Sequence, residues 1–301
     1  MKPARAIERS PALALVGTGA VSVQFGAALA TRLFSRVGPA GAVTLRLVLA
    51  AAVLVSWVAT ARSRRGADRR RRPRSDWLVV VAFGLVLAAM NLSFYEAIDR
   101  IPLGVAVTIE FSGPLAVALA GSRRWTDGLW AGAAGAGVVL LASGAGAALD
   151  PAGIVLALAA GACWAAYILL SRETGRRFDS IHGLAWAMAV GGVAVLPLGV
   201  AVAGSGLARP EVLGMGITVA VLSSVVPYSL ELIALRRVAA RAFGVMMSLD
   251  PALATAAGFL VLGQQLDLRE WVALGLVVGA NVGNSLAGRP LPPTEAPGMT
   301  P

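Results

Sequence analysis

Four ionisable side chains stand inside long apolar stretches of the sequence: Arg46, Glu110, Glu231 and Asp250. Ionisable groups at membrane depth are costly, and by default they mark a pathway or a binding site. An arginine can hold a carboxylate through two parallel hydrogen bonds, and a carboxylate can hold an ammonium group. Low dielectric also favours the neutral form of a carboxylate, so such a group can exchange protons near neutral pH. The set predicts a site for a small zwitterion and for protons.

Uncharged polar side chains and prolines interrupt the same stretches. The polar neighbours are Gln24, Asn91, Tyr95 and Tyr228, and the prolines are Pro114, Pro227 and Pro251. A proline has no N–H, so the helical carbonyl four residues before it loses its donor. The carbonyls concerned are those of Glu110, Ser223 and Met247. Broken backbone at membrane depth is tolerated only inside protein or against a water-filled cavity. We therefore expect Glu110 and Asp250 to face one central cavity that Arg46 also meets.

Within this set we expect Glu110 to be the principal proton and ammonium site, because its carboxylate and its freed carbonyl offer two oxygens to a cation. Asp250 would assist, and Arg46 would hold the substrate carboxylate. Structural alternatives stay open. Arg46 and Glu110 could form only an ion pair that locks the helices together. Other polar members of the set could serve helix packing instead; these are Glu231, Asn91 and Gln24.

The elements that must position these residues are membrane-spanning helices. Apolar residues make up 57% of the 301 residues and charged residues 14%, and the mean hydropathy is +0.75. A soluble domain carries roughly a quarter charged residues. The apolar runs have the length of about 20 residues that a helix needs to cross a bilayer, and they lack period-two alternation. The expected spans are 11–31, 40–60, 77–98, 102–121, 128–148, 152–171, 181–203, 212–235, 242–263 and 270–288.

The basic residues predict how these ten spans are oriented. If the N-terminus is cytoplasmic, 20 of the 26 basic residues fall on the cytoplasmic side and five on the opposite side, and Arg46 lies within a span. Such a bias indicates that both termini are cytoplasmic in a multi-pass inner-membrane protein. The arginine-rich run 61–76 is then a topology anchor that touches anionic lipid. We expect residues 1–10 to be a cytoplasmic N-terminus and residues 289–301 to be a disordered cytoplasmic tail.

A shift of 137 residues partly overlays the two halves of the chain. It places Pro114 on Pro251, and it also pairs Ala97 with Ala234, Arg100 with Arg237 and Gly121 with Gly258. Five spans per half would start the second half on the opposite side of the membrane. The sequence therefore predicts an all-α fold of two inverted five-helix repeats, residues 11–148 and 149–288. In secondary transporters with inverted repeats the substrate site lies near the midplane between the halves.

Several long strings carry a resemblance to a known family. They are GAVTLRLVLA at 41–50, MNLSFYEAI at 90–98, IPLGVAVTIEFSGPLAVALAGSRR at 101–124, GACWAAYIL at 161–169 and VPYSLELIALRRVAARAFGVMMSLDPALA at 226–254. The chain resembles EamA-type members of the drug/metabolite transporter superfamily over about residues 12–288. The positions that match by residue are Gln24, Arg46, Asn91, Tyr95, Glu110, Pro114, Pro227, Tyr228, Glu231 and Pro251. Two positions depart from the pattern: Asp250 and Gln264 stand where relatives usually have Glu.

The resemblance implies ten helices in two repeats and export of small amino acids of the threonine and homoserine kind, driven by proton antiport. The alternative within the superfamily is export of another metabolite or of a drug, although aromatic residues are only 6% of the chain. An enzyme is not expected, because one histidine and one cysteine leave no catalytic or metal-ligand set. The expected partners are a zwitterionic substrate, protons, membrane lipid and a second copy in a homodimer. No cofactor and no nucleic acid is expected.

Overall fold

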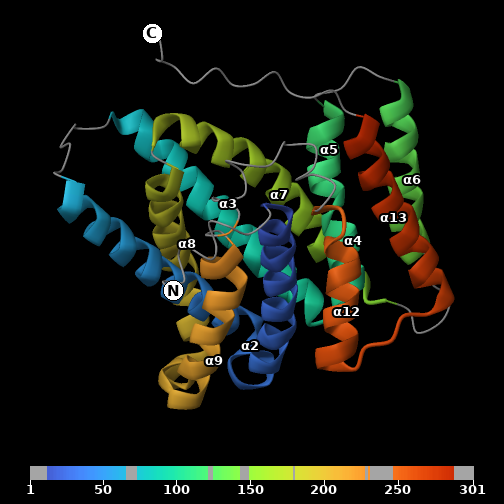
Figure 1. The fold of residues 1–301 in the computed structure, drawn as a ribbon. Coiled ribbons are helices and arrows are strands. Elements are labelled where there is room, and N and C mark those ends of the chain that lie inside the picture. Colours follow the sequence, from blue (N-terminus) through green and yellow to red (C-terminus); the bar gives the residue numbers. More distant parts are fainter. Residues whose placement is uncertain are drawn as a thin grey trace, which may run out of the picture.

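The computed structural model describes residues 12–65, 73–120, 125–142, 149–178, 180–227, 230 and 247–287. Every regular element in these ranges is helical (Figure 1). The elements are α2 (Ala12–Arg65), α3 (Arg74–Ile98), α4 (Leu103–Glu110), α5 (Ser112–Ala120), α6 (Trp125–Ala142), α7 (Pro151–Arg177), α8 (Ser180–Ala203), the 3-10 turn η1 (Gly204–Ala208), α9 (Pro210–Ala220), the π-helical turn η2 (Val221–Val225), α12 (Asp250–Leu262) and α13 (Leu268–Ala287).

Within the described ranges, four helical stretches are long and apolar enough to cross a membrane. They are Ala14–Thr60, Arg74–Ile98, Pro151–Arg177 and Ile181–Ala208. Shorter apolar helices accompany them at Leu103–Val117, Gly128–Leu140, Pro210–Val225 and Asp250–Leu262. The described part of the chain is thus an all-helical, multi-pass membrane protein.

The first two expected spans form one continuous helical stretch that bends at Gly38. The backbone of Gly38 has φ 67° and ψ 169°, a conformation that glycine adopts without steric cost. Pro39 follows and has no N–H to donate. The helix therefore reaches the bend directly instead of ending at residue 31, and the expected loop of eight residues shrinks to a single hinge.

Two other expected spans, 102–121 and 242–263, are interrupted at the residues of interest. The first is divided into α4 and α5 at Phe111, as the missing N–H of Pro114 favours. In the second, Met247 is helical, residues 248–249 form a turn and α12 begins at Asp250, while residues 242–246 lie outside the described residues. Pro251 sits in the first turn of α12, where its missing N–H costs nothing because that group would be unpaired anyway.

Glycines allow the helices to approach closely. A Cβ added to Gly84 would lie 2.5 Å from the carbonyl oxygen of Ala187, so α3 and α8 meet backbone to backbone. Contacts of the same kind join Gly26 to Ser223, Gly104 to Thr255 and Gly199 to Thr44. Small residues serve this purpose in lipid, where association depends on close van der Waals packing rather than on the hydrophobic effect.

The packing of the helices leaves a central space among α2, α3, α4, α7 and α12. Helix α3 packs against α7 and α8, α2 packs against α8, α9 and η2, and α4 packs against α7 and α12. Helices α6 and α13 pair with each other at one side of the bundle (Figure 1). The breaks that begin α5 and α12 both border this central space.

Candidate functional site: a cavity between the broken helices

A cavity of about 460 Å³ lies between the helices that carry the predicted residues. This volume falls within the roughly 300–1,000 Å³ of small-molecule sites. Its wall includes Arg46 from α2, Glu110 at the end of α4 and Asp250 at the start of α12. It also includes the expected neighbours Gln24, Asn91, Pro114 and Pro227. Residues more than two hundred positions apart in the sequence therefore share one wall.

The guanidinium group of Arg46 is held by fixed partners on two other elements. Arg46 is 8% exposed. Its Nη2 donates to the carbonyl oxygen of Ser223 at 2.9 Å, its Nε to Ser224 Oγ at 3.3 Å and its Nη1 to Tyr95 Oη at 3.4 Å. The group also lies 5.7 Å from the centre of the Tyr95 ring. The shortest of these bonds ends on the carbonyl of Ser223, which lies in the π-helical turn just before Pro227.

The two carboxylates of the wall come from the end of α4 and the start of α12, two helices that pack against each other. Glu110 is 8% exposed and Asp250 is 4% exposed. Glu110 is close enough to Arg46 and Asp250 for both charges to act on it. Among the described wall residues, two carboxylates thus accompany one guanidinium. The ionised set has one negative charge in excess, which a proton would balance.

The carbonyl oxygen of Glu110, which we expected to be a second cation ligand, lies close to α7: a Cβ added to Gly161 would be 2.7 Å away from it. A Cβ on Gly113 would in turn collide with the carbonyl of Gly161. The carbonyl that Pro114 frees therefore takes part in a close contact between helices.

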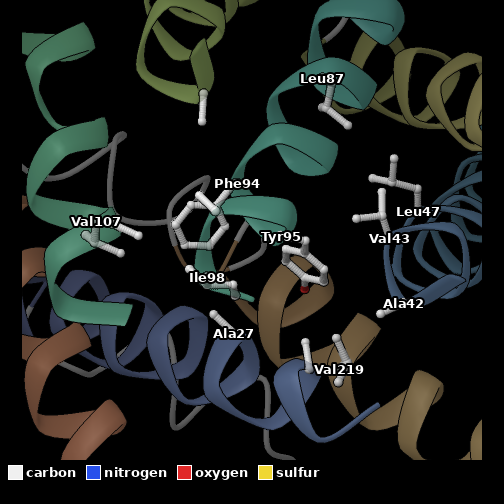
Figure 2. Close-up of a cluster of buried hydrophobic side chains, with 14 of the residues drawn as sticks. Ala27, Ala42, Val43, Leu47, Leu87, Phe94, Tyr95, Ile98, Val107 and Val219 are labelled. Carbon is white, nitrogen blue, oxygen red and sulfur yellow. The ribbon is translucent and has the colours of Figure 1, made fainter. Parts of the chain in front are cut away.

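The other predicted residues lie behind the wall, within it or outside the described ranges. Tyr95 is fully buried between α3, α2 and α9 (Figure 2) and acts on the site through Arg46. Pro251 is buried and is not part of the wall. Asn91 is part of the wall, and its Nδ2 donates to the carbonyl of Leu87 in its own helix at 2.8 Å. Tyr228 and Glu231 lie outside the described residues.

Sequence reasoning missed the aromatic part of the wall. Phe94, Phe111, Trp164 and Tyr167 all line the cavity, so aromatic side chains gather here although they are only 6% of the chain. It also missed the polar wall residues Ser223, Ser248 and Asn281. Asn281 carried a usable signal, because it is an amide side chain within the apolar stretch of α13. The aromatic residues carried none, since in sequence they are indistinguishable from core packing.

Comparisons with known proteins agree with this arrangement. A model of the EamA-like transporter family matches residues 151–286. The chain is 42% identical to the threonine/homoserine exporter RhtA of Salmonella typhimurium (strain LT2), and 41% identical to that of Escherichia coli (strain K12). Both alignments run over 274 residues and cover 89% of each chain. A crystal structure of a protein that is 22% identical has the same fold, with a TM-score of 0.57 over 96% of this chain and 100% of the other. The chain belongs to the EamA-like transporter family, whose members are transporters and not enzymes.

Proposed function

We propose that the protein is a secondary active transporter that exports small amino acids of the threonine and homoserine kind across the inner membrane, in exchange for protons. The observation that carries the proposal is the single cavity whose wall contains Arg46, Glu110 and Asp250. A zwitterion brings one carboxylate and one ammonium group to a site that offers one guanidinium and two carboxylates. The names of the two relatives support this substrate class.

Competition for one carboxylate accounts for the exchange of substrate against protons. When the amino acid is bound, its carboxylate pairs with Arg46 and its ammonium group pairs with one carboxylate of the wall, which we take to be Glu110. When it leaves, that carboxylate stays buried without the ammonium group, which is costly in low dielectric. A proton can neutralise the carboxylate instead, so the proton and the ammonium group compete for it. Competition of this kind couples the two fluxes in opposite directions.

The proposed architecture is ten helices in two inverted repeats, with both termini cytoplasmic. Under the 137-residue shift, α7 corresponds to the first part of α2, and α3 corresponds to the segment of α9 and η2. The contact of α3 with α7 then has its counterpart in the contact of α2 with α9 and η2. The contact of α6 with α13 joins two helices that correspond to each other. This pattern supports a two-fold relation between the halves.

A second candidate function is export of a larger metabolite or drug. The four aromatic residues of the wall favour it, because aromatic lining suits apolar or planar ligands. The two buried carboxylates and Arg46 favour a zwitterion, since a neutral drug could not form ion pairs with these charges.

Efflux from intact cells tests the proposal. Cells that lack their own threonine exporters would be loaded with radiolabelled threonine or homoserine, with and without the protein. We expect faster efflux of both amino acids with the protein, and we expect collapse of the proton gradient to remove the difference. Equal efflux in the two strains would refute amino-acid export, and unchanged acceleration after the collapse would refute proton coupling.

A further inference from the structure

The part of the cavity wall that α7 contributes is apolar. Trp164, Tyr167 and Ile168 of α7 line it, together with Phe111 at the break between α4 and α5 and Leu115 of α5. Helix α7 packs against α3, α4 and α5. Arg46, on α2, is bonded to η2, and Glu110 directly precedes Phe111. A molecule held by Arg46 and Glu110 would therefore also meet these apolar side chains.

The ring pair in this apolar part of the wall is held by the backbone. The rings of Phe111 and Trp164 lie 4.9 Å apart at an interplanar angle of 87°, the edge-to-face arrangement that aromatic pairs prefer. The pair lies next to the contact of Gly113 with Gly161, which leaves no room for a side chain between α5 and α7. Because this contact fixes the two helices, the aromatic wall is part of the scaffold and does not depend on a mobile loop.

The size of the cavity exceeds what the charged groups alone require. Arg46 and the carboxylates engage the α-carboxylate and α-ammonium groups, which every amino acid shares. The remaining space, within the total of about 460 Å³, is available to the substrate side chain and ends at Trp164 and Phe111. A short side chain such as that of threonine would leave much of the apolar wall uncovered. A longer apolar side chain would bury it, and burial of apolar surface is favourable.

We propose that the aromatic wall binds the substrate side chain and that Trp164 sets its size limit, so that the exported amino acids include leucine and methionine. This inference rests on the proposed function and adds a substrate class to it. The aromatic pair would then determine specificity and not only stabilise the contact between α5 and α7. The two roles differ in what a substitution changes: specificity alters the ratio between substrates, whereas packing alters stability or the rate for all substrates equally.

Transport by the purified protein in proteoliposomes tests the inference. Efflux of labelled threonine, leucine, methionine and phenylalanine would be measured with wild type, with Trp164→Leu and with Trp164→Phe, which retains an aromatic ring beside Phe111. The matched control is Trp186→Leu, because Trp186 also forms an edge-on pair, with Trp77 at 5.7 Å, but is not part of the cavity wall.

We expect wild type to export leucine and methionine at least as fast as threonine. Trp164→Leu should raise the efflux of phenylalanine relative to threonine by about tenfold or more, since enlarging an apolar pocket changes discrimination by roughly that factor. Trp164→Phe should shift the ratio in the same direction by less, and it serves as the test if Trp164→Leu does not assemble. The control variant should keep the wild-type ratio.

Two results would overturn the inference and leave the proposed function intact: export of threonine without leucine or methionine, or an unchanged substrate ratio in both Trp164 variants. Failure to export any of the amino acids, threonine included, would instead refute the proposed function together with the inference.

Discussion

Replacing Arg46 with lysine keeps the positive charge of the cavity and removes the planar guanidinium group. In the structure this group bonds three partners, Ser223, Ser224 and Tyr95, from two different elements. The ammonium group of lysine donates from a single nitrogen and cannot reproduce the planar, three-nitrogen arrangement of donors in the guanidinium group. The substitution therefore separates the need for a charge from the need for its orientation.

The size of the effect follows from the bonds that are lost. Hydrogen bonds to charged groups contribute about 1.5–3 kcal/mol each. Loss of one or two of the three bonds of Arg46 should weaken the hold of the site on the substrate carboxylate by about 3 kcal/mol. Since about 1.4 kcal/mol corresponds to a factor of ten, we expect threonine efflux per molecule of Arg46→Lys to fall by roughly 100-fold at subsaturating substrate.

The assay is threonine efflux from proteoliposomes that contain equal amounts of each variant, with the thermal midpoint in detergent as a check of folding. Arg36→Lys is the matched control on the same helix. Arg36 is 47% exposed and lies 3.9 Å from Glu211, and exposed pairs of this kind contribute about 0–1 kcal/mol, so this variant should transport like wild type. Transport by Arg46→Lys within about threefold of wild type would refute the reasoning, because the charge alone would then suffice.

Three further predictions follow from the packing and the topology. Gly161→Ala places a methyl group 2.7 Å from the Glu110 carbonyl, so it should lower the free energy of unfolding by about 1–3 kcal/mol. Gly275→Ala is the control, because an added Cβ there meets nothing within 4 Å, and it should not lower stability. Equal thermal midpoints of the two variants would contradict the close contact. Gln264→Ala removes the side-chain oxygen that accepts a hydrogen bond from Leu103 N–H at 3.0 Å at the start of α4, so it should lower the free energy of unfolding by about 1 kcal/mol. Gln264→Glu keeps an acceptor and should not lower it. Identical unfolding of the two variants would argue against this cap. Accessibility tags at residue 66 and at the C-terminus should both report the cytoplasm and a tag at residue 150 the outside; opposite sides for the first two would exclude ten spans.

The charged part of the site could be predicted from the sequence, because ionisable residues in apolar runs are conspicuous. Arg46, Glu110 and Asp250 meet at one cavity, as the repeated prolines suggested. The break before α5 could also be predicted from the sequence, since Pro114 removes a helical donor. The fold class also followed from the length of the apolar runs, which leaves few alternatives to membrane-spanning helices.

Other features depend on tertiary contacts that no local pattern encodes. A proline within a helix and a proline in the first turn of a helix look alike in sequence, so the start of α12 at Asp250 was not foreseen. The edge-to-face pair of Phe111 and Trp164 exists because Gly113 and Gly161 bring two helices into contact. Tyr95 matched the expected polar set, but only the structure places its hydroxyl group behind Arg46.

Proton movement driven by threonine tests the central claim most directly. Proteoliposomes with an entrapped pH-sensitive dye would receive a threonine gradient at equal pH on both sides. If Glu110 exchanges a proton for the substrate ammonium group, threonine entering the vesicles should drive protons out and raise the internal pH. Glu110→Gln, which keeps the shape but cannot ionise, should abolish this change. Threonine uptake by wild type without any pH change, or the same pH change with Glu110→Gln, would contradict the account.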